Sequence, residues 1–268
     1  MKYYDLIASR MLMCVILYSI SELSKYNNEV KNRIKDHQLN IQFSVEDGPI
    51  EYLEIKNDKI LFERRKKLTS FDARIHFKDE KAFLKILKKE QINFKQLLSE
   101  GKIEINEDPK YENICVDLLN LALPYANYTK GENLSAEDEL VVVKILMYAM
   151  LSGFQEISEV DENVQTEMKG TSVIVQFNIT NGPQCYYYFN DGTFTGFMDV
   201  QHPNPTVNIV MSDLKSALAL LTGQGNATRM LIKGTIQIEG DTAHAAKLMS
   251  LQELISDYQD YIKAKRRK

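Results

Sequence analysis

Cysteine and histidine are scarce in this sequence, and both shortages limit the chemistry that the chain can carry. It has three cysteines in 268 residues, widely spaced and without a C-x-x-C pair. We therefore expect reduced thiols in a cytoplasmic protein and no disulfide framework. The four histidines are scattered, and none stands at the spacing of a metal site. The sequence thus predicts neither a metal centre nor a bound cofactor.

Excess charge of one sign and long apolar runs are also missing. The formal net charge of -4 is too small to indicate a particular partner. An apolar run at Met11–Leu17 is far shorter than the roughly 20 residues that span a bilayer. Asp5 precedes it and Glu22 follows it closely, which is unlike a secretory signal. We expect this run to belong to a buried helix.

The chain contains an internal repeat with an offset of 134 residues. Phe43–Pro49 matches Phe177–Pro183, and nine of 45 gaplessly aligned pairs that start at residue 43 are identical. A one-residue deletion then changes the offset to 133, which aligns Gly101–Ile105 with Gly234–Ile238. Self-similarity over this length predicts two copies of one domain. We place the domains at 1–126 and 135–268, with a linker at about 124–134.

Each copy has the same predicted order of elements. An apolar helix comes first, and then an alternating strand, a Gly-Pro turn, and a hairpin closed at an Asn-Asp sequence. A fourth strand, a helix opened by Asp79 or Ser212, a short helix, a fifth strand and a long closing helix follow. Ser135 is the expected N-cap of the first helix in the second copy. The predicted ranges are helices at 4–24 and 136–155, first strands around 41–45 and 173–179, fourth strands at 72–77 and 206–211, and fifth strands at 102–106 and 235–239.

The second copy resembles the sterol carrier protein 2 (SCP2) family over roughly 136–262. The resemblance rests on Leu218–Asp241, in which a helix ends near a glycine, a second helix follows, and a strand runs from Gly234 to Gly240-Asp241. The first copy resembles the family more weakly. The resemblance implies an α+β class with two tandem SCP2-like domains, each a five-stranded mixed sheet covered by helices. It also implies an apolar tunnel that accepts fatty acyl chains or sterols.

The family has no fixed catalytic residues, so the resemblance implies a non-catalytic lipid-binding or carrier protein. Residues 169–262 hold 5 basic and 8 acidic side chains, whereas residues 1–120 hold 21 and 20. Two interpretations of this low charge stay open, a ligand cavity in the second copy or burial against the first. We expect lipid in the second copy, where Ala217 leaves space that Phe83 fills in the first. The candidate lining residues are Phe194, Phe197, Met198, Met211, Ala217, Leu218, Leu221, Met230, Met249 and Leu254.

Two alternatives accompany this hypothesis. Each lining residue can be ordinary core, and the whole protein can be a protein-interaction or scaffold module whose tunnel is filled. His76 is expected to be a strand residue, not a catalytic base. Basic clusters at Arg64–Lys67 and Lys263–Lys268 have no interleaved aromatic residues, so nucleic acid is not an expected partner. Lys263–Lys268 is either a solvated tail or a weak contact with anionic membrane.

Overall fold

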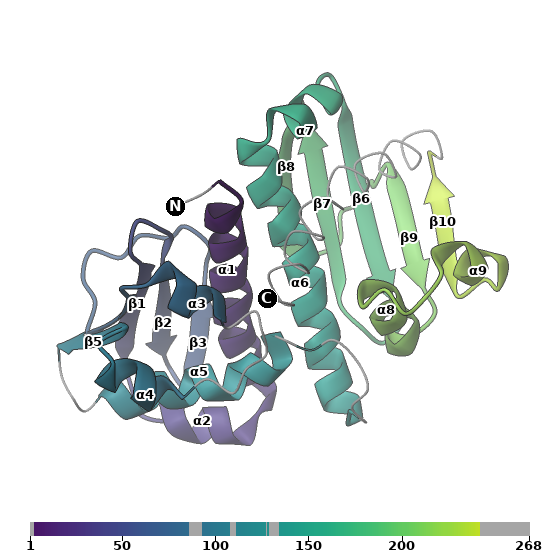
Figure 1. Ribbon diagram of the computed structural model, residues 1–268. Helices are drawn as coiled ribbons and strands as arrows, with labels where there is room; N and C mark the ends of the chain where they lie inside the picture. Colours follow the sequence, from purple (N-terminus) through teal and green to yellow (C-terminus); the bar gives the residue numbers. More distant parts are fainter. Residues whose placement is uncertain (1–2, 86–92, 108–110, 127, 129–133, 242–268) are drawn as a thin grey trace. The chain divides into compact units, whose positions relative to one another are not determined.

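The computed structural model describes residues 3–85, 93–107, 111–126, 128 and 134–241. The chain divides into two compact units, whose described parts lie within Met1–Tyr128 and Thr129–Asp260. Each unit contains one five-stranded sheet with helices (Figure 1). The fold class is α+β, as the sequence predicted.

The sheet of unit 1 has the strand order β3-β2-β1-β4-β5. It is mixed, because β1 and β4 are parallel and the other neighbours are antiparallel. The described elements, in chain order, are α1 (Tyr3–Tyr26), α2 (Asn28–Ile34), β1 (Leu39–Val45), β2 (Ile50–Lys56), β3 (Lys59–Phe62), β4 (Ala73–Phe77), α3 (Glu80–Lys85), α4 (Phe94–Ser99), β5 (Ile103–Glu107) and α5 (Glu112–Ala126).

The sheet of unit 2 has the equivalent order, β8-β7-β6-β9-β10, with β6 and β9 parallel. Its described elements are α6 (Ala136–Val160), α7 (Glu162–Glu167), β6 (Ser172–Ile179), β7 (Gln184–Asn190), β8 (Thr193–Met198), β9 (Val207–Met211), α8 (Leu214–Leu221), α9 (Ala227–Ile232) and β10 (Ile236–Gly240). The closing helix predicted for the second copy lies outside the described residues.

The two sheets share their register as well as their order. Ile41 of β1 pairs with Ala73 of β4, and Val175 of β6 pairs with Val207 of β9, each 134 residues later. The fifth strands, β5 and β10, are both antiparallel edge strands. The prediction that these two segments are the same kind of element is confirmed. Two segments with few identical residues therefore form the same ladder of hydrogen bonds.

Side-chain caps at equivalent positions fix where the helices begin. Ser135 caps α6 as predicted, because its Oγ accepts a hydrogen bond from Asp138 N at 3.1 Å. The prediction that Ser212 opens α8 is wrong by one residue. Asp213 is the cap, and its Oδ1 accepts from Ser216 N at 2.7 Å. Asp213 is the repeat equivalent of Asp79, whose carboxylate accepts a backbone N–H at the start of α3.

Two short helices, α2 and α7, were not predicted. They begin at the caps Asn27 and Asp161, which are 134 residues apart, and each cap accepts hydrogen bonds from two backbone N–H groups. The helices have seven and six residues. Segments this short and polar carry too little apolar periodicity for a prediction.

The predicted apolar helix is confirmed by α1, which is the core helix of unit 1. It packs on α5 and along β3, the edge strand of the sheet. Ser21 Oγ donates to Ile60 O at 2.8 Å, and Ile60 N donates to Ser24 Oγ at 3.2 Å. The helix thus satisfies backbone groups that an edge strand would otherwise leave open for another chain.

By length and composition alone, α1 and α6 are each apolar enough to cross a membrane. However, 83% and 61% of the residues in their apolar windows are buried. Gly196 of β8 shows how closely α6 packs in unit 2, since a Cβ at this glycine would lie 2.9 Å from Leu151 Cβ. Both helices therefore have the burial of core helices.

Candidate functional site

The candidate site lies on the face of the second sheet that its helices cover. Side chains alternate along a strand, so residues two apart share a face. Phe194 and Met198 of β8 lie on the helix-covered face, whereas Phe197 lies on the opposite one. The Phe197 ring stacks on Tyr186 with centroids 4.6 Å apart and is 39% exposed. The prediction that Phe197 and Met198 line the same site is therefore wrong, because consecutive residues of a strand lie on opposite faces of the sheet.

Under α6, this face is filled by an aromatic cluster. The Tyr187 ring lies 4.7 Å from Phe194 and 5.1 Å from Phe189, centroid to centroid, and Phe154 of α6 stacks on Phe194 at 5.0 Å. Burial in this cluster raises the pKa of the Tyr187 phenol far above its usual range. Phe194 is consequently a core residue with ring neighbours on several sides. This half of the unit is packed in the ordinary way.

The other half, beneath α8 and α9, is covered less completely. Ile209 and Leu218 are only part-buried, while their repeat equivalents in unit 1, Ile75 and Leu84, are buried. Ile238 of β10 is 38% exposed. Figure 1 shows α8 and α9 beside β9 and β10. Apolar side chains thus gather here without complete burial, which makes this half of unit 2 the candidate site.

The predicted lining residues occupy different places on this surface. Met211 and Ala217 are completely buried between β9 and α8. Met198, Leu218, Leu221 and Met230 are part-buried. Met249 and Leu254 lie outside the described residues, as does the Lys263–Lys268 tail. Prediction missed Ile209 and Ile238. Ile238 alternates with Gln237 and Glu239 in its strand, so that pattern was available, whereas Ile209 has the apolar Val210 beside it.

Phe83 and Ala217 occupy equivalent positions on α3 and α8. Phe83 is buried, and its ring packs edge-on against Phe77 with centroids 4.9 Å apart. In unit 2 the pair is Ala217 and Met211, both buried as well. Two rings in unit 1 thus correspond to a methyl group and a flexible thioether in unit 2, so the second unit places less side-chain volume at this point.

Among the described residues, unit 1 contains a serine, a histidine and a glutamate in hydrogen-bond contact, on the sheet face away from the helices. Ser44 Oγ lies 2.9 Å from His76 Nδ1, and His76 Nε2 lies 2.8 Å from Glu46 Oε2. Arg74 Nε donates to Ser44 Oγ at 3.3 Å. Ser44 is only 2% exposed, and it lies in a strand that is paired on both sides. An attacking hydroxyl needs access and nearby oxyanion donors, so these residues form a structural polar network.

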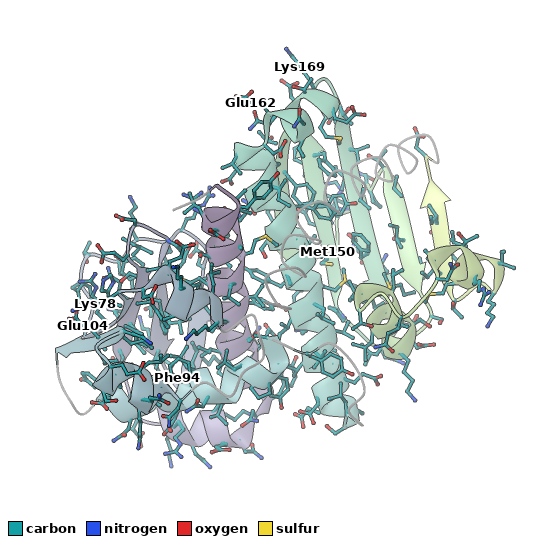
Figure 2. The ribbon with its side chains drawn as sticks, viewed as in Figure 1. Lys78, Phe94, Glu104, Met150, Glu162 and Lys169 are labelled. Carbon is teal, nitrogen blue, oxygen red and sulfur yellow. The ribbon has the colours of Figure 1, made fainter. Side chains whose placement is uncertain are left out.

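The same face carries an ion pair one strand further on. Lys78 and Glu104 form a salt bridge at the edge of the sheet, where Figure 2 shows the two side chains next to each other. Glu104 is directly opposite His76 in the register of β4 and β5. His76 is therefore a strand residue within a polar surface, in agreement with the sequence prediction.

The three cysteines are buried thiols. Burial raises the pKa of the Cys115 thiol to about 12 and that of the Cys185 thiol further still. A thiolate nucleophile at neutral pH is therefore strongly disfavoured at both positions. In the described part of the chain, no three His, Cys, Asp or Glu side chains gather as metal ligands would.

Comparison with known proteins finds a family match over part of the chain. Residues 154–253 match the model of the SCP-2 sterol transfer family. The matched segment includes β6 to β10, α8 and α9, and so contains the whole described candidate site. No curated protein matches the chain significantly.

Several solved structures are also similar over part of the chain. Palmitated SCP2L2 from Aedes aegypti is 22% identical over 38% of this chain and 89% of its own, with a TM-score of 0.30. The sterol carrier protein domain 2 of Helicoverpa armigera is 21% identical over 46% and 94%, with a TM-score of 0.33. The inverting sec-alkylsulfatase Pisa1 from Pseudomonas sp. is 9% identical over 62% and 28%, with a TM-score of 0.27.

Proposed function

We propose that the protein is a non-catalytic lipid carrier that binds a fatty acyl or sterol-like molecule in unit 2, between the sheet and α8 and α9. The family match over residues 154–253 supports a sterol or lipid carrier of this broad type. The observation that carries the location is the incomplete burial of Ile209 on β9 and of its neighbours on α8, in contrast to their equivalents in unit 1. An apolar ligand gains about 25 cal/mol for each Å² of such surface that it removes from water.

Residues in and around the site favour a ligand without charge near its chain. From Leu214 to Ile238 the only charged side chains are Lys215, Arg229 and Lys233, and all three are exposed. A charge facing an apolar ligand without a partner would cost several kcal/mol. Met211 and Met230 suit acyl chains of varied shape, because the thioether side chain adapts to imprecise contacts.

The test is binding of a fluorescent fatty acid by the full chain and by Ala217→Phe. Phenylalanine is tolerated at the equivalent position of unit 1, so this substitution gives the second copy the side chain of the first. If Ala217 borders an open space, the variant loses fatty acid binding while its thermal unfolding changes little. Phe83→Leu is the matched control in unit 1 and should bind as the wild type does.

The competing function is a protein-interaction module that keeps the fold with a filled interior. In that case Ala217→Phe overpacks a closed core and destabilises unit 2 by about 1–3 kcal/mol. The wild type would then bind no fatty acid, and native mass spectrometry of protein purified from cells would show no retained lipid. Binding that survives Ala217→Phe would place the lipid elsewhere and contradict the proposed site.

A further inference from the structure

Helix α9 exposes its apolar side chains to an unusual degree. Ile232 is 81% exposed and Leu231 is 41% exposed, although both lie in a helix of a folded unit. Arg229 and Lys233 are exposed on the same helix and at its C-cap. A single exposed apolar residue is ordinary in a soluble protein, but two adjacent ones flanked by cations need a reason.

Helix α4, the equivalent of α9 in unit 1, shows whether the fold itself requires exposed apolar side chains in this helix. The two helices are built alike, since the caps Asn93 and Asn226 each accept a hydrogen bond from the third helical residue, at 3.1 and 2.9 Å. Both helices are followed by a glycine with positive φ, at Gly101 and Gly234. Their equivalence confirms the offset of 133 for residue-by-residue comparison.

At that offset, the exposed positions of the two helices differ in chemistry. Unit 1 has Ser99 where α9 has Ile232, and Glu100 where α9 is capped by Lys233. Gln96 stands in the place of Arg229. The same helix therefore forms with polar or acidic residues at these three positions, although it keeps Leu98 in the place of Leu231. Ile232, Arg229 and Lys233 are therefore not required by folding, so they point to a partner.

Charge identifies the partner's chemistry. Helix α9 and its C-cap, residues 227 to 233, have two basic residues and no acidic one, whereas the whole chain has a net charge of -4. A surface that accepts Ile232 must be apolar inside, and one that accepts Arg229 and Lys233 must be negative outside. An anionic lipid bilayer has both properties, with apolar chains beneath phosphate and carboxylate groups.

We propose that α9 is a membrane-docking element, in which Leu231 and Ile232 insert at the surface of an anionic bilayer while Arg229 and Lys233 bind the headgroups. Because α9 borders the candidate lipid site, docking would bring that site to the membrane from which lipid is taken or to which it is delivered. That role rests on the proposed function, whereas the docking itself does not.

The test is co-sedimentation of the full chain with phosphatidylcholine vesicles, with and without phosphatidylserine. Two variants transplant the residues of α4 onto α9, Ile232→Ser and the pair Arg229→Gln with Lys233→Glu. Insertion of one large aliphatic side chain contributes about tenfold to a hundredfold in affinity, and each cation near an anionic surface contributes about fivefold. We therefore expect Ile232→Ser to lose about tenfold or more, and the double variant about 25-fold or more.

The control has the same change in charge at a different place, Lys56→Gln with Lys59→Glu on the β2–β3 hairpin of unit 1. Both control lysines are exposed, and this variant should bind vesicles within about twofold of the wild type, because it leaves the side chains of α9 and its C-cap unchanged. Circular dichroism would verify that every variant is folded. Binding of the wild type should also require phosphatidylserine and weaken as salt is raised.

The outcomes separate docking from lipid carriage. Equal vesicle affinity of the wild type and both folded α9 variants would overturn the proposal, as would a wild type that does not bind phosphatidylserine vesicles at low salt. A wild-type dimer that Ile232→Ser converts to a monomer would assign α9 to a second copy of the chain instead. Uptake of free fluorescent fatty acid should be unchanged in Ile232→Ser. If the wild type takes up no fatty acid, the carrier function is refuted and the vesicle result still stands.

Discussion

Replacement of Phe83 by alanine tests the claim that this ring fills the interior of unit 1. Phe83 is 2% exposed and packs edge-on against Phe77. Buried Phe→Ala changes cost about 3–5 kcal/mol, of which an aromatic pair of this geometry contributes about 0.5–1.5 kcal/mol. A small domain is stable by about 5–15 kcal/mol in total. Phe83→Ala should therefore remove a large part of the stability of unit 1.

Amide hydrogen exchange measures this loss separately in each unit. The chain has no tryptophan, so indole fluorescence is not an option, whereas peptides from β1 and β4 report unit 1 and peptides from β6 and β9 report unit 2. A loss of about 3–5 kcal/mol raises exchange in the unit 1 core about a hundredfold to several thousandfold, since each 1.4 kcal/mol is about tenfold. Exchange in β6 and β9 serves as the internal reference. A rise of less than about tenfold in unit 1 would show that Phe83 does not fill its interior.

Two further predictions concern single groups in the structure. Native Cys14, Cys115 and Cys185 should resist a water-soluble thiol reagent at neutral pH and all react after denaturation; rapid labelling of folded protein would contradict the raised thiol pKa values at the last two. Asp213→Ala should lower the free energy of unfolding by about 1 kcal/mol at neutral pH. Because the hydrogen bond from Ser216 N is the main cause that lowers the folded pKa of Asp213, the carboxylate's contribution is present above its unfolded pKa and is lost as pH falls through the lower, folded one. Asp213→Asn should keep most of the cap without this pH dependence, and a pH-independent difference in stability between the wild type and the Asp213→Asn variant would contradict the assignment.

The sheet of each unit could be predicted from local signals because those signals are also its physical causes. Asn57 and Asp58 have positive φ at the β2–β3 turn, as do Asp191 and Gly192 at the β7–β8 turn. Short polar residues and glycine adopt this conformation at low cost, so the hairpins are visible in the sequence. Alternation then fixes which face each strand buries.

The site was less predictable, because its properties depend on which face and which element lie opposite. Phe197 was predicted as a lining residue because it is apolar. Its neighbour Met198 lies on the helix-covered face of the sheet, and consecutive strand residues cannot share a face. The exposure of Ile232 was equally hidden, since an apolar helix of six residues gives no periodicity that separates a buried side from an exposed one. Only the comparison with Ser99 in a folded equivalent reveals that the isoleucine is not needed for packing.

The repeat also shows how one fold can hold two different interiors. Glu51 of β2 lies on the helix-covered face of unit 1 and is buried, and its Oε2 accepts a hydrogen bond from Arg65 N at 2.9 Å. A buried carboxylate needs such donors, and an acyl chain in their place would leave the charge against hydrocarbon. The equivalent residue in unit 2 is Cys185, a small and buried thiol whose raised pKa keeps it neutral. Unit 1 thus places a buried charge at this position, whereas unit 2 has a neutral thiol there, beside the ion pair in which Lys144 Nζ lies 3.0 Å from Asp199 Oδ2. This difference supports the proposal that lipid binds in the second copy.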